Sequence, residues 1–172
     1  MFQSKRFIEK NTPAYAKSRF QFLQQLVTEY QESSDTEVRK TAVAHLANFA
    51  YDPINHRWLV QLNATDLFLD IVAETEDNEL RQFALGGLCN IAIDPEAQHL
   101  IATGDGIPLI ASTLSSGSPD IVLTAMTTLY LLINPSTKPY ILTSGIKAYL
   151  TSAVQSANPR ISNLAGAILE LV

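Results

Sequence analysis

The chain has a single cysteine, Cys89, among its 172 residues, so it cannot form an internal disulfide. This favours an intracellular, reducing compartment. Cys89 falls beside apolar positions of a helical pattern, and we expect it to be a small buried hydrophobe rather than a reactive thiol. No apolar run approaches the roughly 18–20 residues that cross a bilayer, and residues 1–6 lack the apolar core of a signal peptide. The chain is therefore expected to be soluble, with no membrane attachment.

The motifs of common catalytic and metal sites are also missing. HExxH, CxxC, GxSxG, phosphate-loop and dinucleotide-binding patterns do not occur. The three histidines, at positions 45, 56 and 99, lie singly, and His45 is interpreted as a surface histidine rather than a ligand or base. The sequence therefore predicts no enzyme activity, no cofactor, no metal and no small-molecule substrate.

Positive charge is scarce and unevenly placed. The chain has 12 Lys and Arg against 17 Asp and Glu, a net charge of −5. Five of the 12 bases lie in the first 19 residues, and residues 1–12 are interpreted as a flexible basic arm. Residues 66–79 hold six acids and no base, which we interpret as a solvated face rather than a metal site. Such a chain is poorly suited to direct binding of nucleic acid and better suited to a basic protein partner.

What the chain does have is an internal repeat. Residues 38–53 recur as residues 80–95 after a shift of 42, so that Asn48 falls on Asn90. Shifts of 41 and then 40 carry the pattern to two later copies. Repetition at a period of about 41 residues indicates a solenoid of helical units. We predict one domain over residues 13–172, with units at about 13–53, 54–95, 96–135 and 136–172.

The spacing inside each unit is helical. Apolar residues recur at steps of three and four, and prolines at positions 53, 95 and 135 are expected to end the last helix of a unit. Asp35 and Asp66 are expected to cap the helices that follow them. Small residues are expected where neighbouring long helices approach closely, at Ala42, Ala84, Ala125 and Ala165.

These features together resemble the armadillo repeat family. Each complete unit contains a short, a middle and a long helix. The Thr-Gly-Asp-Gly-Ile-Pro turn at residues 103–108 and the asparagine of an Ala-x-x-x-Leu-x-Asn pattern on the long helix, at positions 48 and 90, add to the resemblance. Ankyrin and tetratricopeptide units are shorter and have two helices, and the two-helix HEAT unit is the nearest structural rival. The resemblance implies an all-α, right-handed armadillo-type helical solenoid of about four repeats, acting as a scaffold for protein–protein interaction.

Five strings carry a more specific resemblance. Residues 26–32, 45–53, 67–70, 83–90 and 125–129 are similar to a member of the armadillo family that serves mRNA splicing. That resemblance implies a nuclear protein of a small nuclear ribonucleoprotein, a spliceosome subunit best known from the minor spliceosome. It implies an RNA-binding motif protein 48-like partner and a U6-type small nuclear RNA, whose capped 5′ end is held mainly through that partner. The alternatives are a general armadillo adaptor for a basic peptide outside splicing and, less favoured, a direct RNA-binding protein.

The expected binding surface is a concave groove lined by the long helices. In the armadillo family an asparagine ladder pairs with the main chain of an extended peptide, and Asn48 and Asn90 match that position. The tryptophans of nuclear-import receptors are replaced by small residues, which argues against recognition of their localisation signals. Small residues at positions 44, 86 and 87 are expected to leave the floor open. The predicted groove comprises Lys40, Ala44, His45, Asn48, Tyr51, Gln82, Gly86, Asn90, Ile93, Tyr130, Leu131 and Asn134. The alternative is that the two asparagines bond neighbouring backbone within the stack.

A second interface is expected at the C-terminal edge. Ile161, Ala165 and Leu169 continue the core pattern of the long helices. Leu164, Ile168 and Leu171 are expected to form an apolar surface that packs against the partner or against a second copy of the chain. The alternative is that Leu164 and Ile168 are buried within the last unit.

Overall fold

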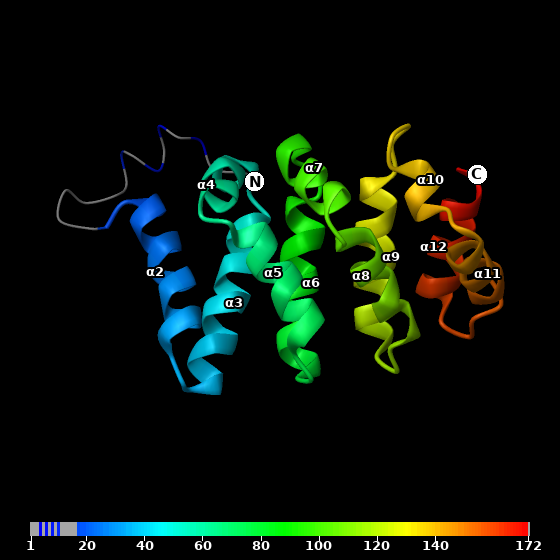
Figure 1. Ribbon diagram of the computed structural model, residues 1–172, viewed down its shortest axis with the longest axis horizontal. Helices are drawn as coiled ribbons and strands as arrows, with labels where there is room; N and C mark the ends of the chain where they lie inside the picture. Colours follow the sequence, from blue (N-terminus) through cyan, green and yellow to red (C-terminus); the bar gives the residue numbers. More distant parts are fainter. Residues whose placement is uncertain (1–3, 5, 7, 9, 11–16, 172) are drawn as a thin grey trace.

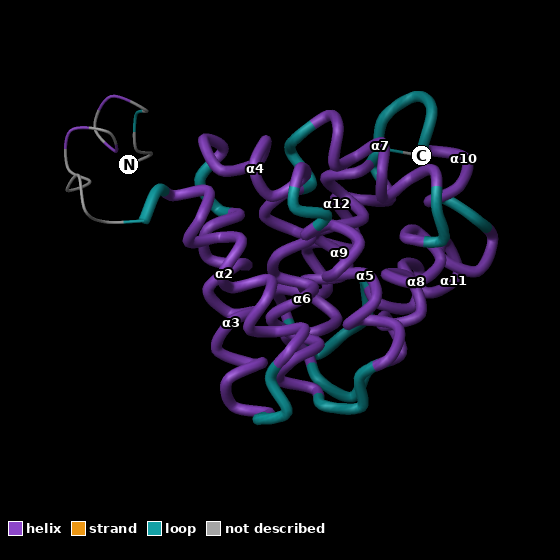
Figure 2. Tube along the Cα trace, turned by 60° about the vertical axis from the view of Figure 1, so that its left-hand side comes forward, coloured by secondary structure: helices purple, strands orange, loops and turns teal. Residues whose placement is uncertain are grey.

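The computed structural model describes Ser4, Arg6, Ile8, Lys10 and residues 17–171. These residues form helices and connecting loops, with no strand among them (Figure 2). None of their helices is long and apolar enough to cross a membrane. Most of the predicted basic arm lies outside the described residues. Of those described there, Arg6, Ile8 and Lys10 are helical, and Ile8 is buried.

The helices form four units that follow one another along the long axis of the molecule (Figure 1). The first contains α2 (Arg19–Glu32) and α3 (Thr36–Ala50). The second contains η1 (Pro53–Asn55), α4 (His56–Gln61), α5 (Ala64–Glu74) and α6 (Asn78–Ile91). The third contains α7 (Pro95–Thr103), α8 (Gly106–Ser112), η2 (Thr113–Ser115) and α9 (Pro119–Leu132). The fourth contains α10 (Lys138–Ile141), α11 (Ser144–Ala153) and α12 (Pro159–Leu169). The predicted all-α solenoid is confirmed.

The long helices α3, α6, α9 and α12 form one row, each packed against the next. The middle helices α5, α8 and α11 pack against the long helix of their own unit. The alanines expected at close approaches are all buried: Ala42, Ala84, Ala125 and Ala165. A larger side chain at any of them would overpack the row, at about 1–3 kcal/mol.

Three of the four long helices, α3, α6 and α12, begin at a polar residue whose side chain caps the helix. The Asp35 carboxylate accepts hydrogen bonds from the backbone N–H groups of Glu37 and Val38, as predicted. Asp77 caps α6 in the same way, and the side chain of Asn158 caps α12. Each cap pairs backbone donors that the helix itself leaves unpaired.

The predicted cap at Asp66 is wrong. Helix α5 begins two residues earlier, after Asn63, whose φ of 54° is in the left-handed region. Asparagine visits this region more readily than most residues do, because its short polar side chain bonds locally. Asp66 lies in the first turn instead, where a carboxylate interacts favourably with the helix dipole.

The long helices end at the predicted positions, and the next unit satisfies their terminal carbonyls. Helices α3, α6 and α9 end just before the expected prolines. The buried His56 donates from Nε2 to the Ala50 carbonyl oxygen at 2.8 Å. Gln98, at the same position one unit later, donates from Nε2 to the Ala92 carbonyl oxygen at 2.7 Å. The first helix of a unit therefore fixes the end of the preceding long helix.

Candidate functional site

The row of long helices leaves one side exposed, which we call the long-helix face. Its residues repeat once per unit and form four rows. They are an acidic row (Glu37, Glu79 and Asp120), a small row (Ala44, Gly86 and Thr127), an amide row (Asn48, Asn90 and Leu131) and an outer row (Tyr51, Ile93 and Asn134), which is apolar in its first two members and has the exposed Tyr130 one helical turn before the third. Repeated positions on parallel helices give a surface that runs along the solenoid.

The two asparagines of the amide row differ in what they bond. Asn90 is half-buried and donates from Nδ2 to the Ala47 carbonyl oxygen of the neighbouring helix at 2.9 Å. Asn48 is exposed, and no hydrogen bond of its side chain is found among residues 17–171. Asn90 therefore serves the stack, whereas the Asn48 amide is available to a ligand. Leu131 is half-buried and carries no amide, as the sequence indicated.

The small row is open at Gly86. A Cβ atom placed there would meet no atom within 4 Å, and Ala44 on the neighbouring helix is half-buried. The prediction that Gly87 also opens the floor is wrong. A Cβ atom at Gly87 would lie 2.4 Å from Cζ of Phe68, because this residue faces the middle helix of its own unit.

Lys40 does not present a free cation on this face. Its Nζ lies 2.8 Å from Asp77 Oδ2, 3.1 Å from Glu79 Oε2 and 3.5 Å from Glu37 Oε1. The hydrogen bonds to Asp77 and Glu79 raise the pKa of the Lys40 ammonium above its ordinary value. The same Lys40 bond, helped by the N–H of Leu80, lowers the pKa of Asp77. Lys40 thus ties α3 to the start of α6.

Gln82 plays a similar linking role one unit later. Its Nε2 donates to Thr124 Oγ1 at 3.0 Å, which joins α6 to α9, and the residue is half-buried. Two predicted groove residues, Lys40 and Gln82, therefore hold neighbouring long helices together. His45 is exposed on α3, and Asn134 at the end of α9 bonds within its own turn to Ser136 and Thr137.

Large apolar side chains are exposed along the C-terminal ends of the long helices. Tyr51 is 65% exposed and Ile93 is 51% exposed, and the two residues occupy the same repeat position. Tyr130 in the last turn of α9 is also exposed. Exposed apolar side chains that cluster on one face favour an interaction site.

The predicted interface at the C-terminal edge is wrong for Ile168. That residue is 2% exposed and lies in the core, and Leu164 is half-buried against it. Ile168 corresponds by repeat to Gly87 and Thr128, which are also buried. Leu171 is exposed. The alternative of burial within the last unit is the one observed for Ile168.

The remaining candidates from the sequence are structural. Cys89 is half-buried, and burial raises the pKa of its thiol, with a smaller opposing effect of its interaction with the Thr128 side chain. His45 and His99 are exposed, whereas His56 is buried. Among the described residues, no group of three or more histidines, cysteines or acids is placed to hold a metal ion.

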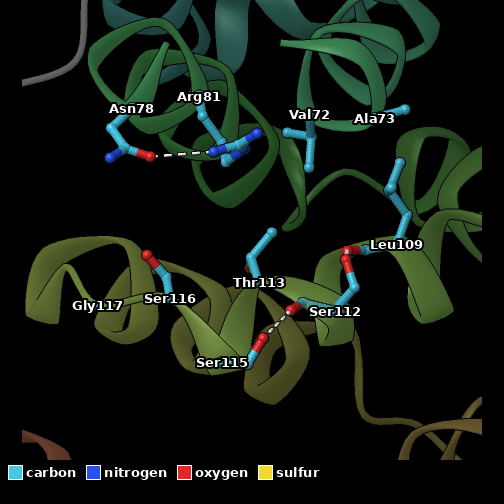
Figure 3. Close-up of a pocket in the computed structure, with 10 residues that line it drawn as sticks. All are labelled: Val72, Ala73, Asn78, Arg81, Leu109, Ser112, Thr113, Ser115, Ser116 and Gly117. Carbon is cyan, nitrogen blue, oxygen red and sulfur yellow. Dashed lines mark hydrogen bonds between the residues drawn. The ribbon is translucent and has the colours of Figure 1, made fainter. Parts of the chain in front are cut away.

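One polar pocket was not anticipated from the sequence. It has a volume of about 430 Å³ and lies between α5 and α6 on one side and α8, η2 and the loop after η2 on the other (Figure 3). Arg81 lines it, but its Nη1 donates to Asn78 Oδ1 at 3.0 Å and its Nη2 donates to the Thr75 carbonyl oxygen. The serine-rich stretch at residues 112–118 was the available signal. The guanidinium is already engaged, so this pocket is a weaker candidate than the long-helix face.

The stacked three-helix units and their row of long helices define an armadillo-type repeat protein. Three solved structures each match most of the chain. An engineered protein is 25% identical with a TM-score of 0.77, covering 86% of this chain and 36% of its own. A computationally designed armadillo repeat protein for modular peptide recognition is 24% identical with a TM-score of 0.76, covering 86% and 63%. Another designed armadillo repeat protein, in complex with the peptide (KR)4, is 23% identical with a TM-score of 0.76, covering 86% and 63%.

Among curated proteins, the chain is similar to Armadillo repeat-containing protein 7 of Mus musculus. The two are 50% identical over 56 residues, which is 33% of this chain and 28% of the mouse protein. The matched stretch thus spans less than a third of the mouse protein. No family model matches the chain. The fold and the partial match together support a protein-interaction scaffold.

Proposed function

We propose that this chain is a non-catalytic adaptor that binds a protein partner through its long-helix face. The observation that carries the proposal is the repeated surface in which the exposed Asn48 amide, the open position at Gly86 and the exposed Tyr51 and Ile93 lie on adjacent helices. An amide offers a donor and an acceptor to a peptide backbone. A solved designed protein of the same fold holds a peptide, so a protein segment is a ligand compatible with this architecture.

The finer proposal is a role in splicing. We propose that the partner is an RNA-binding motif protein 48-like protein and that the complex acts in the nucleus as part of the minor spliceosome. In that complex the chain helps to hold the capped 5′ end of a U6-type small nuclear RNA. The strings at residues 26–32, 45–53 and 83–90 support this, because they resemble a splicing member of the family.

The proposed contact with RNA runs through the partner. The cations of the repeat region are few, and Lys40 and Arg81 are bonded within the protein. Arg39 lies over the ring of Tyr30, with 4.4 Å between its Cζ and the ring centroid. A surface with these cations engaged and an exposed acidic row does not suit phosphate contact.

The test is recovery of partners from nuclear extract by the tagged full chain. Mass spectrometry identifies the proteins and sequencing identifies the RNA. We expect one dominant protein together with a U6-type RNA, and we expect Asn48→Ala to reduce recovery of both. Gln24→Ala, which removes an exposed amide from α2, is the matched control and should recover both at the wild-type level.

Two results would contradict the proposal. If Asn48→Ala and Gln24→Ala recover the partner protein and the RNA equally well, the long-helix face is not the binding surface. Recovery of a protein without any small nuclear RNA would refute the splicing role and leave the general adaptor.

A further inference from the structure

The two edges of the long-helix face differ in chemical character. At the N-terminal ends of the long helices, the exposed carboxylates of Glu37, Glu79 and Asp120 occur once per unit. Arg160 stands at this position in the fourth unit, and its Nη1 lies 3.9 Å from Asp120 Oδ1. The side chain of Lys40 is only 16% exposed, whereas those of Glu37 and Glu79 are 81% and 61% exposed. The outer surface of this edge is therefore acidic.

The opposite edge is apolar. Tyr51 and Ile93 lie at the C-terminal ends of α3 and α6, and Tyr130 lies in the last turn of α9, one helical turn before Asn134, the residue that corresponds to them by repeat. None of the three carries a charge, and each exposes at least 39% of its surface. A ligand that covers both edges therefore needs basic groups on one side and large apolar groups on the other.

The small row lies midway between these edges. Ala44 is seven residues from Glu37 and seven from Tyr51, and Gly86 is placed in the same way between Glu79 and Ile93. At 1.5 Å per residue, seven residues of helix correspond to about 10 Å. A chain lying over the small row therefore has both edges within the combined reach of long side chains. The exposed Asn48 amide is one helical turn from Ala44, beside this path.

We propose that the long-helix face binds an extended protein segment in which basic and large apolar side chains alternate. Successive side chains of an extended strand point to opposite sides, so alternation sends every basic group to one edge and every apolar group to the other. The basic groups face Glu37, Glu79 and Asp120, and the apolar groups face Tyr51, Ile93 and Tyr130. This inference rests on the proposed adaptor function and specifies the chemistry of its partner.

Synthetic peptides test the alternation directly. A peptide of about ten residues spans about 33 Å, enough to cross three helices spaced at about 10 Å. We compare alternating Arg–Leu, a block peptide of the same composition and alternating Glu–Leu, using the full chain and fluorescence anisotropy. We expect the alternating Arg–Leu peptide to bind at least about tenfold more tightly than the block peptide, and to weaken with salt. Equal affinity of these two, or tighter binding of Glu–Leu, would overturn the inference.

Two glycine variants locate the site. A Cβ atom meets nothing within 4 Å at either Gly86 of α6 or Gly166 of α12, so both accept a larger residue without a clash at Cβ. Gly86→Leu should weaken binding of the alternating peptide about tenfold or more, whereas Gly166→Leu should leave it unchanged. Melting curves establish that both variants are folded. Wild-type affinity in folded Gly86→Leu would overturn the inference.

Further outcomes separate this inference from the adaptor proposal. If Gly86→Leu abolishes partner recovery while the alternating and block peptides bind equally, the adaptor proposal stands and the alternation is refuted. If Gly86→Leu recovers the partner at the wild-type level, the proposed binding face is itself wrong. If the wild-type chain self-associates in sedimentation and Gly86→Leu abolishes this, the ligand of the face is a second copy of the chain and the inference is wrong. Tighter binding of a labelled single-stranded RNA than of the alternating peptide would overturn the inference as well.

Discussion

At the scale of single residues, Asn48 and Asn90 share a repeat position but not a role. The Asn90 amide is committed to the Ala47 carbonyl, whereas Asn48 is exposed on the first long helix. The repeat shift could predict both positions. It could not predict which amide is engaged, because that depends on the neighbouring helix, and α3 has α2 rather than another long helix on its other side.

We therefore expect opposite effects of two alanine substitutions on stability and binding. Asn90→Ala removes a hydrogen bond between two helices and should lower the free energy of unfolding by about 1 kcal/mol. Asn48→Ala should leave stability within about 0.5 kcal/mol of the wild type and weaken partner binding. Urea unfolding and calorimetry measure the two quantities. Equal stability of the two variants would contradict the assignment.

A second prediction at this scale concerns His56. This buried residue and Gln98 make the same bond to the end of the preceding long helix. His56→Leu would leave the Ala50 carbonyl without this donor, at about 1–3 kcal/mol of stability. His56→Gln introduces the residue that the next unit has at this position, Gln98, which can donate to the same carbonyl. It should therefore lower the stability less than His56→Leu does. Thermal unfolding of both variants tests this, and a more stable leucine variant would refute it.

At the scale of helices, the sequence was most informative about the long ones. Their ends follow from the prolines, and their close contacts follow from the repeated alanines. It was least informative about short elements and about helix orientation. The start of α5 depends on the left-handed Asn63, and the burial of Ile168 depends on which neighbour covers that side of α12. Periodicity identifies an apolar stripe but does not identify its partner.

Two adjacent glycines of α6 give a sharp test of helix packing. Gly87→Ala would bring a Cβ atom against the ring of Phe68 and should destabilise the protein by about 1–3 kcal/mol. Gly86→Ala meets open space and should stabilise the helix by about 0.5–1 kcal/mol. Denaturant unfolding gives both values. The same sign for both variants would show that α6 is rotated from the described orientation.

The link between α3 and α6 predicts a dependence on pH. The bond from Lys40 lowers the pKa of Asp77 below its ordinary value of 3.8. The stability contributed by the carboxylate is therefore present above pH 3.8 and is lost as the pH falls through the lower value of the folded state. Lys40→Met should be less stable than the wild type at neutral pH. The difference in stability between the two proteins should shrink as the pH falls through the folded-state pKa of Asp77. Lys147→Met, in α11, is the control. A difference that does not change with pH would contradict the link.

At the scale of the whole molecule, the repeat period gave the architecture and the broad position of the site. The long-helix face could be predicted from the positions that recur in each unit. Its acidic and apolar edges could not, because exposure depends on how far each helix is covered by its neighbours. The polar pocket beside Arg81 could not be predicted either, because its walls come from two units and depend on how those units pack against each other.

The charge of the whole molecule predicts weak direct binding of RNA. With a net charge of −5 and few unengaged cations in the described repeats, the isolated chain should bind a capped RNA only weakly, with a steep dependence on salt. Filter binding at several salt concentrations measures this. Submicromolar affinity at physiological salt would show that the chain contacts RNA directly.

The central claim is that the long-helix face contacts a protein partner, and site-directed photocrosslinking tests it most directly. A photoreactive amino acid replaces Asn48 on that face or Ala148, an exposed residue of the middle helix α11. In nuclear extract, position 48 should crosslink to the same protein that the tagged chain recovers, and position 148 should not. Crosslinking from position 148 alone, or from position 48 to RNA alone, would contradict the account.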